Sequence, residues 1–140
     1  MAFATSAVFG ALLEDALENT AAFSLDTDAH KVALFNNTTV PDEDATTANT
    51  LYNAGTWTTV NEVDDGTNWD AAGEPLVTPT LTRAAGVLTF DGVDTVQGGA
   101  NTTLAAVFGC AIFDTTTASQ GVCYNDFGGT QSVTSGVSVA

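Results

Sequence analysis

The clearest alternation of apolar and polar residues lies toward the C-terminal end of the chain, over residues 104–139. Apolar runs rich in Val, Phe, Ile, Tyr and Cys are separated there by short stretches of Thr, Ser, Gly and Asp. This pattern is typical of strands joined by turns. It predicts two long strands connected by residues 114–119 and followed by a third strand. With that connection, Cys110 lies opposite Cys123 in the pair.

Both faces of this predicted strand pair are apolar. One face carries Phe108, Cys110, Ile112 and Cys123, and the other carries Val107, Ala111, Phe113, Val122 and Tyr124. An antiparallel pair with one face in water would place polar residues on that face. We therefore expect cover on both sides, from an opposing sheet on one side and from a further element on the other.

The only helical pattern lies in residues 3–19. Its apolar residues recur at spacings of three and four, namely Val8, Leu12, Leu13, Ala16 and Leu17, and Thr5 or Ser6 is a candidate N-cap. A helix of this length is marginal by itself and has to pack against something. Two interpretations stay open: the helix covers the chain's own sheet, or it is an N-terminal arm that reaches a neighbouring subunit.

The remaining apolar runs predict further strands at 21–25, 31–36 and 56–63, and a hairpin formed by 80–82 and 87–90. Residues 45–52 fit either one helical turn or an extended crossing. Short strands at intervals of about eight to twelve residues with Gly, Asp and Asn between them indicate an all-β fold. The predicted fold is mainly β, an antiparallel β-sandwich or barrel with a short N-terminal helix or arm. Residues 1–20 form the arm, and residues 21–140 form a single β-sandwich domain.

The charge of the chain narrows the range of partners. Seventeen acidic residues stand against two basic ones, Lys31 and Arg83, which gives a formal net charge of −15. Binding to nucleic acid needs Lys and Arg in numbers that this chain lacks, and an anionic membrane would repel it. A basic protein surface, or solubility at high concentration, fits better. No apolar run is long enough to span a membrane, and residues 2–13 lack the basic start of a secretion signal.

The sequence contains no recognisable catalytic motif. His30 is the only histidine, so no second imidazole is available for a metal site or a proton relay. Cys110 and Cys123 lie within apolar strands, where we expect free and unreactive thiols in preference to a disulfide. We therefore predict a protein that is not an enzyme, with no catalytic residues, no cofactor and no metal. Whether the acidic loop around Asp64 and Asp65 holds calcium stays open, because it supplies many oxygens but lacks the order of an EF-hand loop.

Several short motifs resemble those of small structural proteins from tailed bacteriophages. They are HKVALFNN at 30–37, TVNEV at 59–63, VLTFDG at 87–92, FGCAIFD at 108–114 and GVCYNDFGG at 121–129. The resemblance covers about residues 21–139. These motifs carry strand residues and no catalytic signature.

The resemblance implies a virion protein, most simply a capsid decoration (cement) protein that binds the outside of the phage head and stabilises it. The implied partner is the major capsid protein, together with further copies of the chain itself, with a trimer favoured and with no nucleic acid or membrane. The implied location is the outer surface of the capsid, after synthesis in the host cytoplasm. As interface residues we predict Phe3, Val8, Phe9, Leu12 and Leu13. Removing residues 1–20 should then abolish shell binding and leave a folded core.

Two alternatives remain at this stage. One is a tail-associated virion protein with the same type of β fold. The other is a soluble carbohydrate- or ligand-binding β module, in which Trp57, Trp69 and Tyr52 would form a sugar platform. Exposure of these rings on one face would favour binding, and burial would favour a structural role.

Overall fold

The computed structural model describes residues 3–93 and 102–134. Along the chain it contains β1 (Ala7–Val8), α1 (Gly10–Glu18), β2 (His30–Phe35), α2 (Thr47–Thr50), β3 (Glu74–Pro75), β4 (Val77–Ala84), β5 (Val87–Val93), β6 (Leu104–Asp114) and β7 (Gln120–Val133). The strands form a five-stranded antiparallel sheet in the order β1-β7-β6-β2-β3 and a separate two-stranded sheet, β4-β5. The prediction of a mainly β fold is confirmed.

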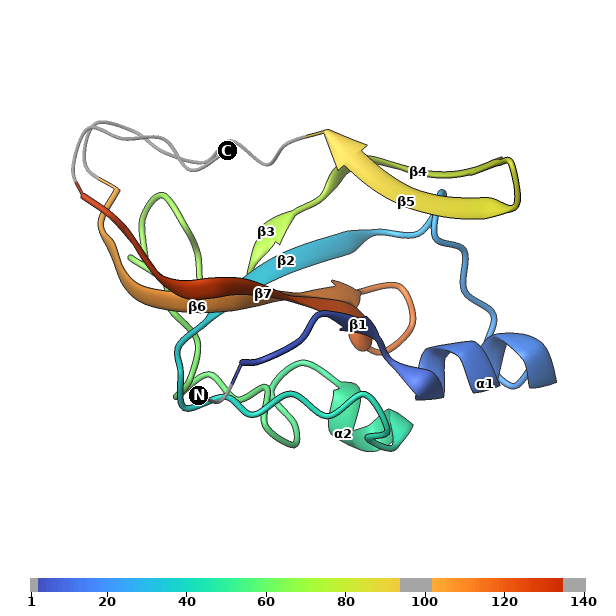
Figure 1. Cartoon of the computed structure of the whole chain (residues 1–140), viewed down its shortest axis with the longest axis horizontal. Helices are drawn as coiled ribbons and strands as arrows, with labels where there is room; N and C mark the ends of the chain where they lie inside the picture. Colours follow the sequence, from blue (N-terminus) through green and yellow to red (C-terminus); the bar gives the residue numbers. More distant parts are fainter. Residues whose placement is uncertain (1–2, 94–101, 135–140) are drawn as a thin grey trace.

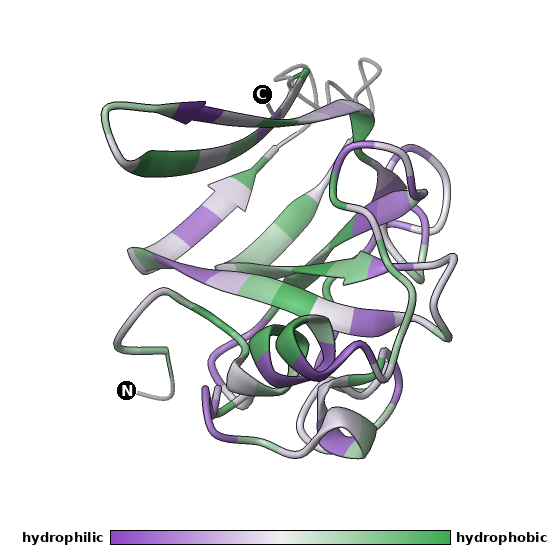
Figure 2. Cartoon of the chain, turned by 90° about the vertical axis from the view of Figure 1, so that its right-hand side faces the viewer, coloured by the Kyte–Doolittle hydropathy of each residue, from purple (hydrophilic) through white to green (hydrophobic). Residues whose placement is uncertain are grey.

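The elements are arranged in layers around the larger sheet. Helices α1 and α2 lie on one side of it and the β4-β5 hairpin lies on the other (Figures 1 and 2). Successive residues of β2 alternate between the two sides, with Ala33 and Phe35 in one buried cluster and Leu34 in the other, as the two-residue period of a strand requires. The expectation that both faces of the central strands are covered is therefore correct, although the second sheet has only two strands.

The pairing of β6 with β7 differs from the predicted register. Cys110 lies opposite Asn125, and Cys123 lies opposite Ile112. The predicted Cys110–Cys123 pair is therefore wrong by two positions. One position arises because Asp114 belongs to the strand, opposite Gln120, where its Oδ1 accepts the N–H groups of Thr116 and Thr117. The second arises from an irregularity between Ile112 and Phe113.

The predicted third strand is in part a continuation of β7. The break expected at Gly128 and Gly129 is a bulge inside one long strand, because both glycines adopt positive φ angles of 72° and 156°. Only glycine takes such angles without strain. Beyond this bulge Gln131 pairs with Val107, and residues 135–139 of the prediction lie outside the described residues.

The N-terminal segment forms a short edge strand before its helix. Ala7 and Val8 pair with Tyr124 and Cys123 of β7, and α1 begins only at Gly10, later than the pattern predicted. The helix ends where Asn19 turns into the left-handed region at φ 54° and donates its N–H to Asp15. The helix therefore packs on the chain's own sheet, which was the first of the two interpretations.

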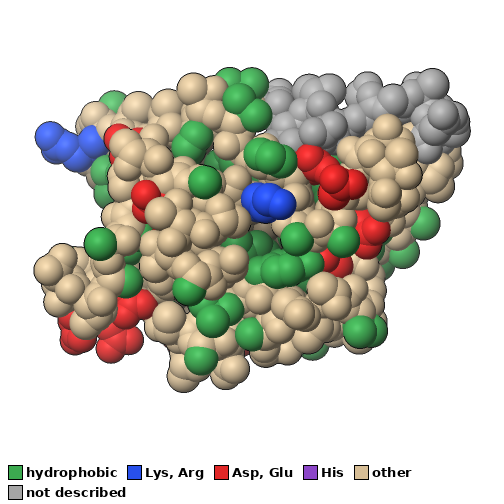
Figure 3. All heavy atoms as spheres, turned by 180° about the vertical axis from the view of Figure 1, so that it is seen from behind, with side chains coloured by type: hydrophobic (Ala, Val, Ile, Leu, Met, Phe, Trp, Pro, Cys, Tyr) green, Lys and Arg blue, Asp and Glu red, His purple; other side chains and the backbone are tan. Residues whose placement is uncertain are grey.

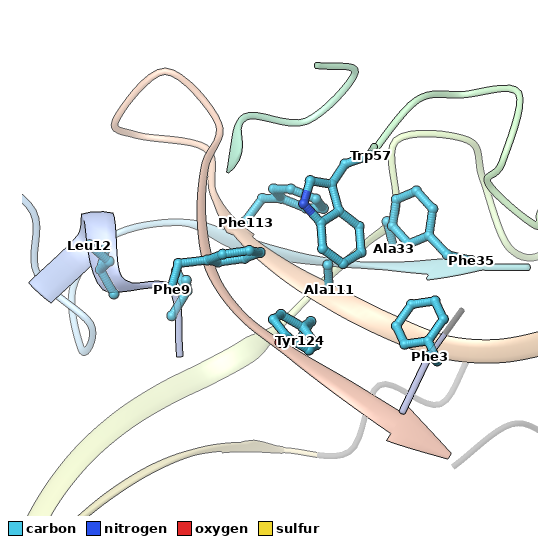
Figure 4. Packing of buried hydrophobic residues seen from close by; sticks show 10 residues of the cluster. Phe3, Phe9, Leu12, Ala33, Phe35, Trp57, Ala111, Phe113 and Tyr124 are labelled. Atoms are coloured by element: carbon cyan, nitrogen blue, oxygen red, sulfur yellow. The ribbon is translucent and has the colours of Figure 1, made fainter. Parts of the chain in front are cut away.

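Trp57 is the centre of the larger buried cluster. Its ring is fully buried and lies within 5.0–6.2 Å, centroid to centroid, of five other aromatic rings. These are Phe3, Phe9, Phe35, Phe113 and Tyr124, and Figure 4 shows them converging from the N-terminal segment and the central strands. Aromatic pairs at such separations contribute beyond the area they bury.

Two predicted strands are absent because their residues serve this packing instead. Residues 56–63 form turns with a single bridge between Glu62 and Phe35, since Trp57 is turned into the core. Residues 21–25 are also irregular. The open question at 45–52 is answered by α2, a single helical turn. The predicted hairpin is present and longer than expected, as β4 and β5.

Candidate interaction surfaces

The structure separates the five predicted interface residues into two groups. Phe3, Phe9 and Leu12 are almost completely buried in the chain's own core. Phe3 and Phe9 pack against Trp57, and Leu12 belongs to the same buried cluster (Figure 4). All three are core residues and cannot contact a partner from this position. The sequence pattern could not separate these roles, since core and interface residues are both apolar. Only Val8 and Leu13 are open to a partner, with 48% and 53% of their surface exposed.

This burial also corrects the predicted division into an arm and a core. Residues 3–12 supply three side chains to the main cluster, and the backbone of Phe9 donates to the carbonyl of Val122 at 3.1 Å. Removing residues 1–20 would open the core, so a truncated chain would not test an interface. Three apolar side chains of this segment remain exposed, Val8 in β1 and Leu13 and Leu17 in α1, and Leu17 is 87% exposed.

The β4-β5 hairpin is the most exposed apolar element among the described residues. Leu81, Val87 and Leu88 keep between 40% and 66% of their surface in water. Residues directly opposite in the pair share a face, so Leu88 and Arg83 lie on the same face as Leu81 and Phe90. An isolated two-stranded hairpin is only marginally stable in water. This hairpin is therefore held by its base or by a partner.

The base of the hairpin is anchored on His30. The ring of Phe90 packs against the imidazole, with centroids 5.4 Å apart, and the N–H of Leu76 donates to the carbonyl of His30 at 2.9 Å. Among the described residues, neither ring nitrogen of His30 has a hydrogen-bond partner. His30 is therefore a buried residue at the start of β2, beneath the hairpin.

The rings proposed for a sugar platform are not displayed on the surface. Trp57 and Trp69 are both buried, and they belong to two different clusters on opposite sides of the sheet. By the criterion set from the sequence, their role is structural. Tyr52 is only partly buried and lines a small slot of about 160 Å³ with Lys31, Ala72, Phe113, Thr115 and Ser119. Figure 3 shows the molecule from behind the view of Figure 1, and in the middle of that face apolar side chains gather beside a basic one.

Beside this slot, Tyr52 and Glu62 form a hydrogen-bonded pair. The Tyr52 hydroxyl donates to Oε2 of Glu62 at 2.5 Å. Burial raises the pKa of both groups, and the bond to Glu62 raises the pKa of Tyr52 further. The phenol therefore keeps its proton at neutral pH. The pair ties the loop that holds Trp57 to the segment that bridges to β2.

Asp65 organises the acidic loop that was considered for calcium. Its Oδ1 accepts the backbone N–H groups of Thr67, Asn68 and Trp69 at 2.7–3.0 Å, and its Oδ2 accepts that of Thr103 at 3.3 Å. These bonds, chiefly from Trp69 and Asn68, hold the pKa of Asp65 well below its ordinary value. Within residues 3–93 and 102–134, no three His, Cys, Asp or Glu side chains are grouped as a metal site would require. The carboxylate oxygens of Asp65 accept backbone hydrogen bonds.

The two cysteines are free thiols, as predicted from the sequence. Burial raises the pKa of Cys110 to about 12 and that of Cys123 to about 11. The thiolate is the reactive form of cysteine, so neither side chain offers a nucleophile at neutral pH.

Comparisons with known proteins provide no relative for this chain. No family model, no curated protein and no solved structure matches it. In the part of the chain that the structure describes, no helix is both long and apolar enough to cross a bilayer.

Proposed function

We propose that this chain is a virion structural protein, a capsid decoration protein that binds the outside of a tailed-bacteriophage head and stabilises the shell. The proposal rests first on the resemblance of its strand motifs to small phage structural proteins. Three of those motifs occupy neighbouring strands: HKVALF is β2, FGCAIFD lies in β6 and GVCYNDFGG lies in β7. The resemblance therefore concerns the centre of the larger sheet, and this observation carries the proposal.

The surface of the chain supports the same role. A decoration protein has to stay soluble at high copy number, and a net charge of −15 opposes aggregation in solution. It also needs apolar contacts for its neighbours. Val8 and Leu13 retain enough exposed surface to provide such a contact with the coat protein. We therefore assign shell binding to these two residues, in place of the larger set predicted from the sequence.

A pelleting experiment tests this function. Mature phage shells that lack this protein would be mixed with the purified chain and sedimented, and the bound copies would be counted against the coat subunits. Saturable binding at a fixed ratio to the coat protein is the expected result, and that ratio also tests the expected trimer. Binding to purified tails, with none to intact shells, would contradict decoration and favour the tail-associated alternative.

Two variants make the experiment specific for the proposed contact. The change Leu13→Asp places a charge on the exposed side of α1 without touching Leu12, and it should weaken shell binding. The matched change Val60→Asp places the same charge at another exposed apolar residue, 86% of whose surface is in water, and it should bind as the parent does. Equal loss in both variants would show that added negative charge, not the α1 contact, is responsible.

A further inference from the structure

Helix α1 turns a strip of apolar side chains toward solvent. Leu12 packs into the main cluster, but Leu13 and Leu17 leave 53% and 87% of their surfaces in water. Residues four apart are neighbours on one face of a helix, so these two leucines form a continuous strip. A single exposed apolar residue is common on soluble proteins. Two large ones in this spacing are the anchors by which an amphipathic helix contacts a partner.

Two carboxylates flank this strip. Glu14 and Glu18 each follow one of the leucines in sequence, which places them about 100° further around the helix. Both side chains are exposed, and among the described residues neither has a hydrogen-bond or ion-pair partner. Asp15 of the same helix differs, because its carboxylate accepts three side-chain hydrogen bonds at 2.7–3.1 Å. In Figure 2, where the end of the molecule that carries α1 faces the viewer, hydrophobic and hydrophilic residues lie side by side on this helix.

The positions of Glu14 and Glu18 are unfavourable for the helix itself. The last turn of α1 contains no basic residue, so Glu18 places a negative charge at the negative end of the helix dipole. Like charges four residues apart also destabilise a helix. The basic residues of the chain, Lys31 and Arg83, lie in β2 and β4 and form no ion pair with these carboxylates in the described structure. A cation brought by another molecule would relieve both effects.

We propose that Leu13, Leu17, Glu14 and Glu18, which we call the outer face of α1, dock on a partner protein surface where apolar side chains lie beside lysine or arginine. The apolar strip and its acidic flank match such a surface in both respects. A chain of net charge −15 attracts a basic partner as a whole, and the exposed leucines select the place of contact. Leu13 also belongs to the shell contact proposed above, so naming the coat protein as this partner rests on the proposed function.

A synthetic peptide tests the chemistry of this face without a phage shell. The peptide has leucines along one side of a helix and lysines along the other, and it is added to the full, isotope-labelled chain. Because acidic residues are spread over the molecule, the place where the peptide binds is informative. We expect the largest changes in amide chemical shift at residues 13–18. Changes centred elsewhere, or no changes at all, would overturn the proposal.

One pair of variants tests the apolar strip. Leu17→Ser should weaken peptide binding by about tenfold, because it removes apolar surface that the contact buries. Val60→Ser alters a residue with the same exposure, 86% of its surface, on a different segment, and should bind as the parent does. Equal affinities for these two variants would overturn the assignment of the leucines.

A second pair tests the acidic flank. The double change Glu14→Gln with Glu18→Gln should weaken peptide binding by about three- to tenfold, as expected for two exposed ion pairs. Asp64→Asn with Asp70→Asn removes the same formal charge from two other exposed side chains and should cost less than about twofold. Equal losses in both double variants would show that only the net charge matters and would overturn the proposal.

The same variants on phage shells separate this inference from the proposed function. A parent chain that pellets with shells, with weaker binding only in the α1 variants, would identify the coat protein as the partner. A parent chain that does not pellet would contradict the proposed function and leave the peptide result as the test of the face. Shell binding that is unchanged in the α1 variants would exclude the coat protein as the partner of this face.

Discussion

The ring of Phe9 lies against Gly121 at the place where any other residue would carry its Cβ. A Cβ built on Gly121 would come within 2.6 Å of the Phe9 ring and within 2.7 Å of the carbonyl oxygen of Thr50. Gly109 stands in the same relation to Phe3, at 2.5 Å. Because Gly109 and Gly121 have no Cβ, the rings of Phe3 and Phe9 can pack directly against the central strands. The N-terminal segment contributes to the core through these two rings.

The first prediction concerns this close approach. Gly121→Ala should destabilise the protein by about 1–3 kcal/mol, because the added methyl group forces ring and backbone apart in a packed core. Urea unfolding followed by tryptophan fluorescence would measure the loss. In a Phe9→Ala background the same change should cost less, because neighbouring substitutions are not additive. An equal cost in both backgrounds would show that the ring is not the cause.

The second prediction concerns the aromatic centre of the core. Trp57→Ala should cost about 3–5 kcal/mol, because it removes the ring around which five others pack and leaves a cavity. Val60→Ala, three residues along the same irregular segment, should change stability by less than about 0.5 kcal/mol, because Val60 is exposed. Thermal or urea unfolding of both variants makes the comparison. Similar costs for the two changes would contradict the assignment of Trp57 as the core centre.

The third prediction concerns Asp65 and acid. Its pKa is lower in the folded chain than in the unfolded chain, so its charge stabilises the fold above the ordinary aspartate pKa of about 3.9. That contribution is lost as the pH falls below this value toward the folded pKa. Asp65→Asn should therefore lower the Tm at pH 7 and differ less from the parent as the pH drops below about 4.

The neighbouring change Asp64→Asn is the control for this measurement, because it removes the same formal charge from an exposed side chain. It corrects for the general repulsion among acidic residues, which also weakens in acid. Melting curves from pH 7 to about pH 3 would show whether only Asp65→Asn loses stability at neutral pH. Parallel behaviour of the two variants would contradict the role given to the Asp65 hydrogen bonds.

The fourth prediction concerns the two thiols, of which Cys110 is buried and Cys123 is partly buried. Because burial raises the pKa of Cys110 to about 12 and that of Cys123 to about 11, both should react slowly with iodoacetamide at pH 8 in the folded protein and quickly in urea. Folding stability should also fall as the pH rises above about 8.5, where unfolded thiols ionise and folded ones do not. Mass spectrometry of the alkylated chain would report both sites. Complete modification of the native protein within minutes would show that the thiols are accessible.

Local patterns in the sequence determined the class of the fold and several of its elements. The alternation of apolar residues with Gly, Asp and Thr predicted the central hairpin, the β4-β5 hairpin and cover on both faces of the larger sheet, because strand period and turn chemistry are local properties. The free cysteines followed from their apolar setting in the same way. The net charge of −15 likewise needed no structure.

Tertiary structure alone decided the register, the roles of the apolar residues and the surfaces left open. Cys110 and Cys123 have the spacing of a cross-strand pair, but Asp114 and a bulge shift the strands by two positions. Phe9 and Leu13 belong to one apolar pattern, yet Phe9 is in the core and Leu13 is exposed. The Phe9 ring occupies the space that a Cβ on Gly121 would fill. His30 follows a polar turn in sequence but lies beneath Phe90. Burial depends on contacts between residues far apart in the chain, and no local pattern records them.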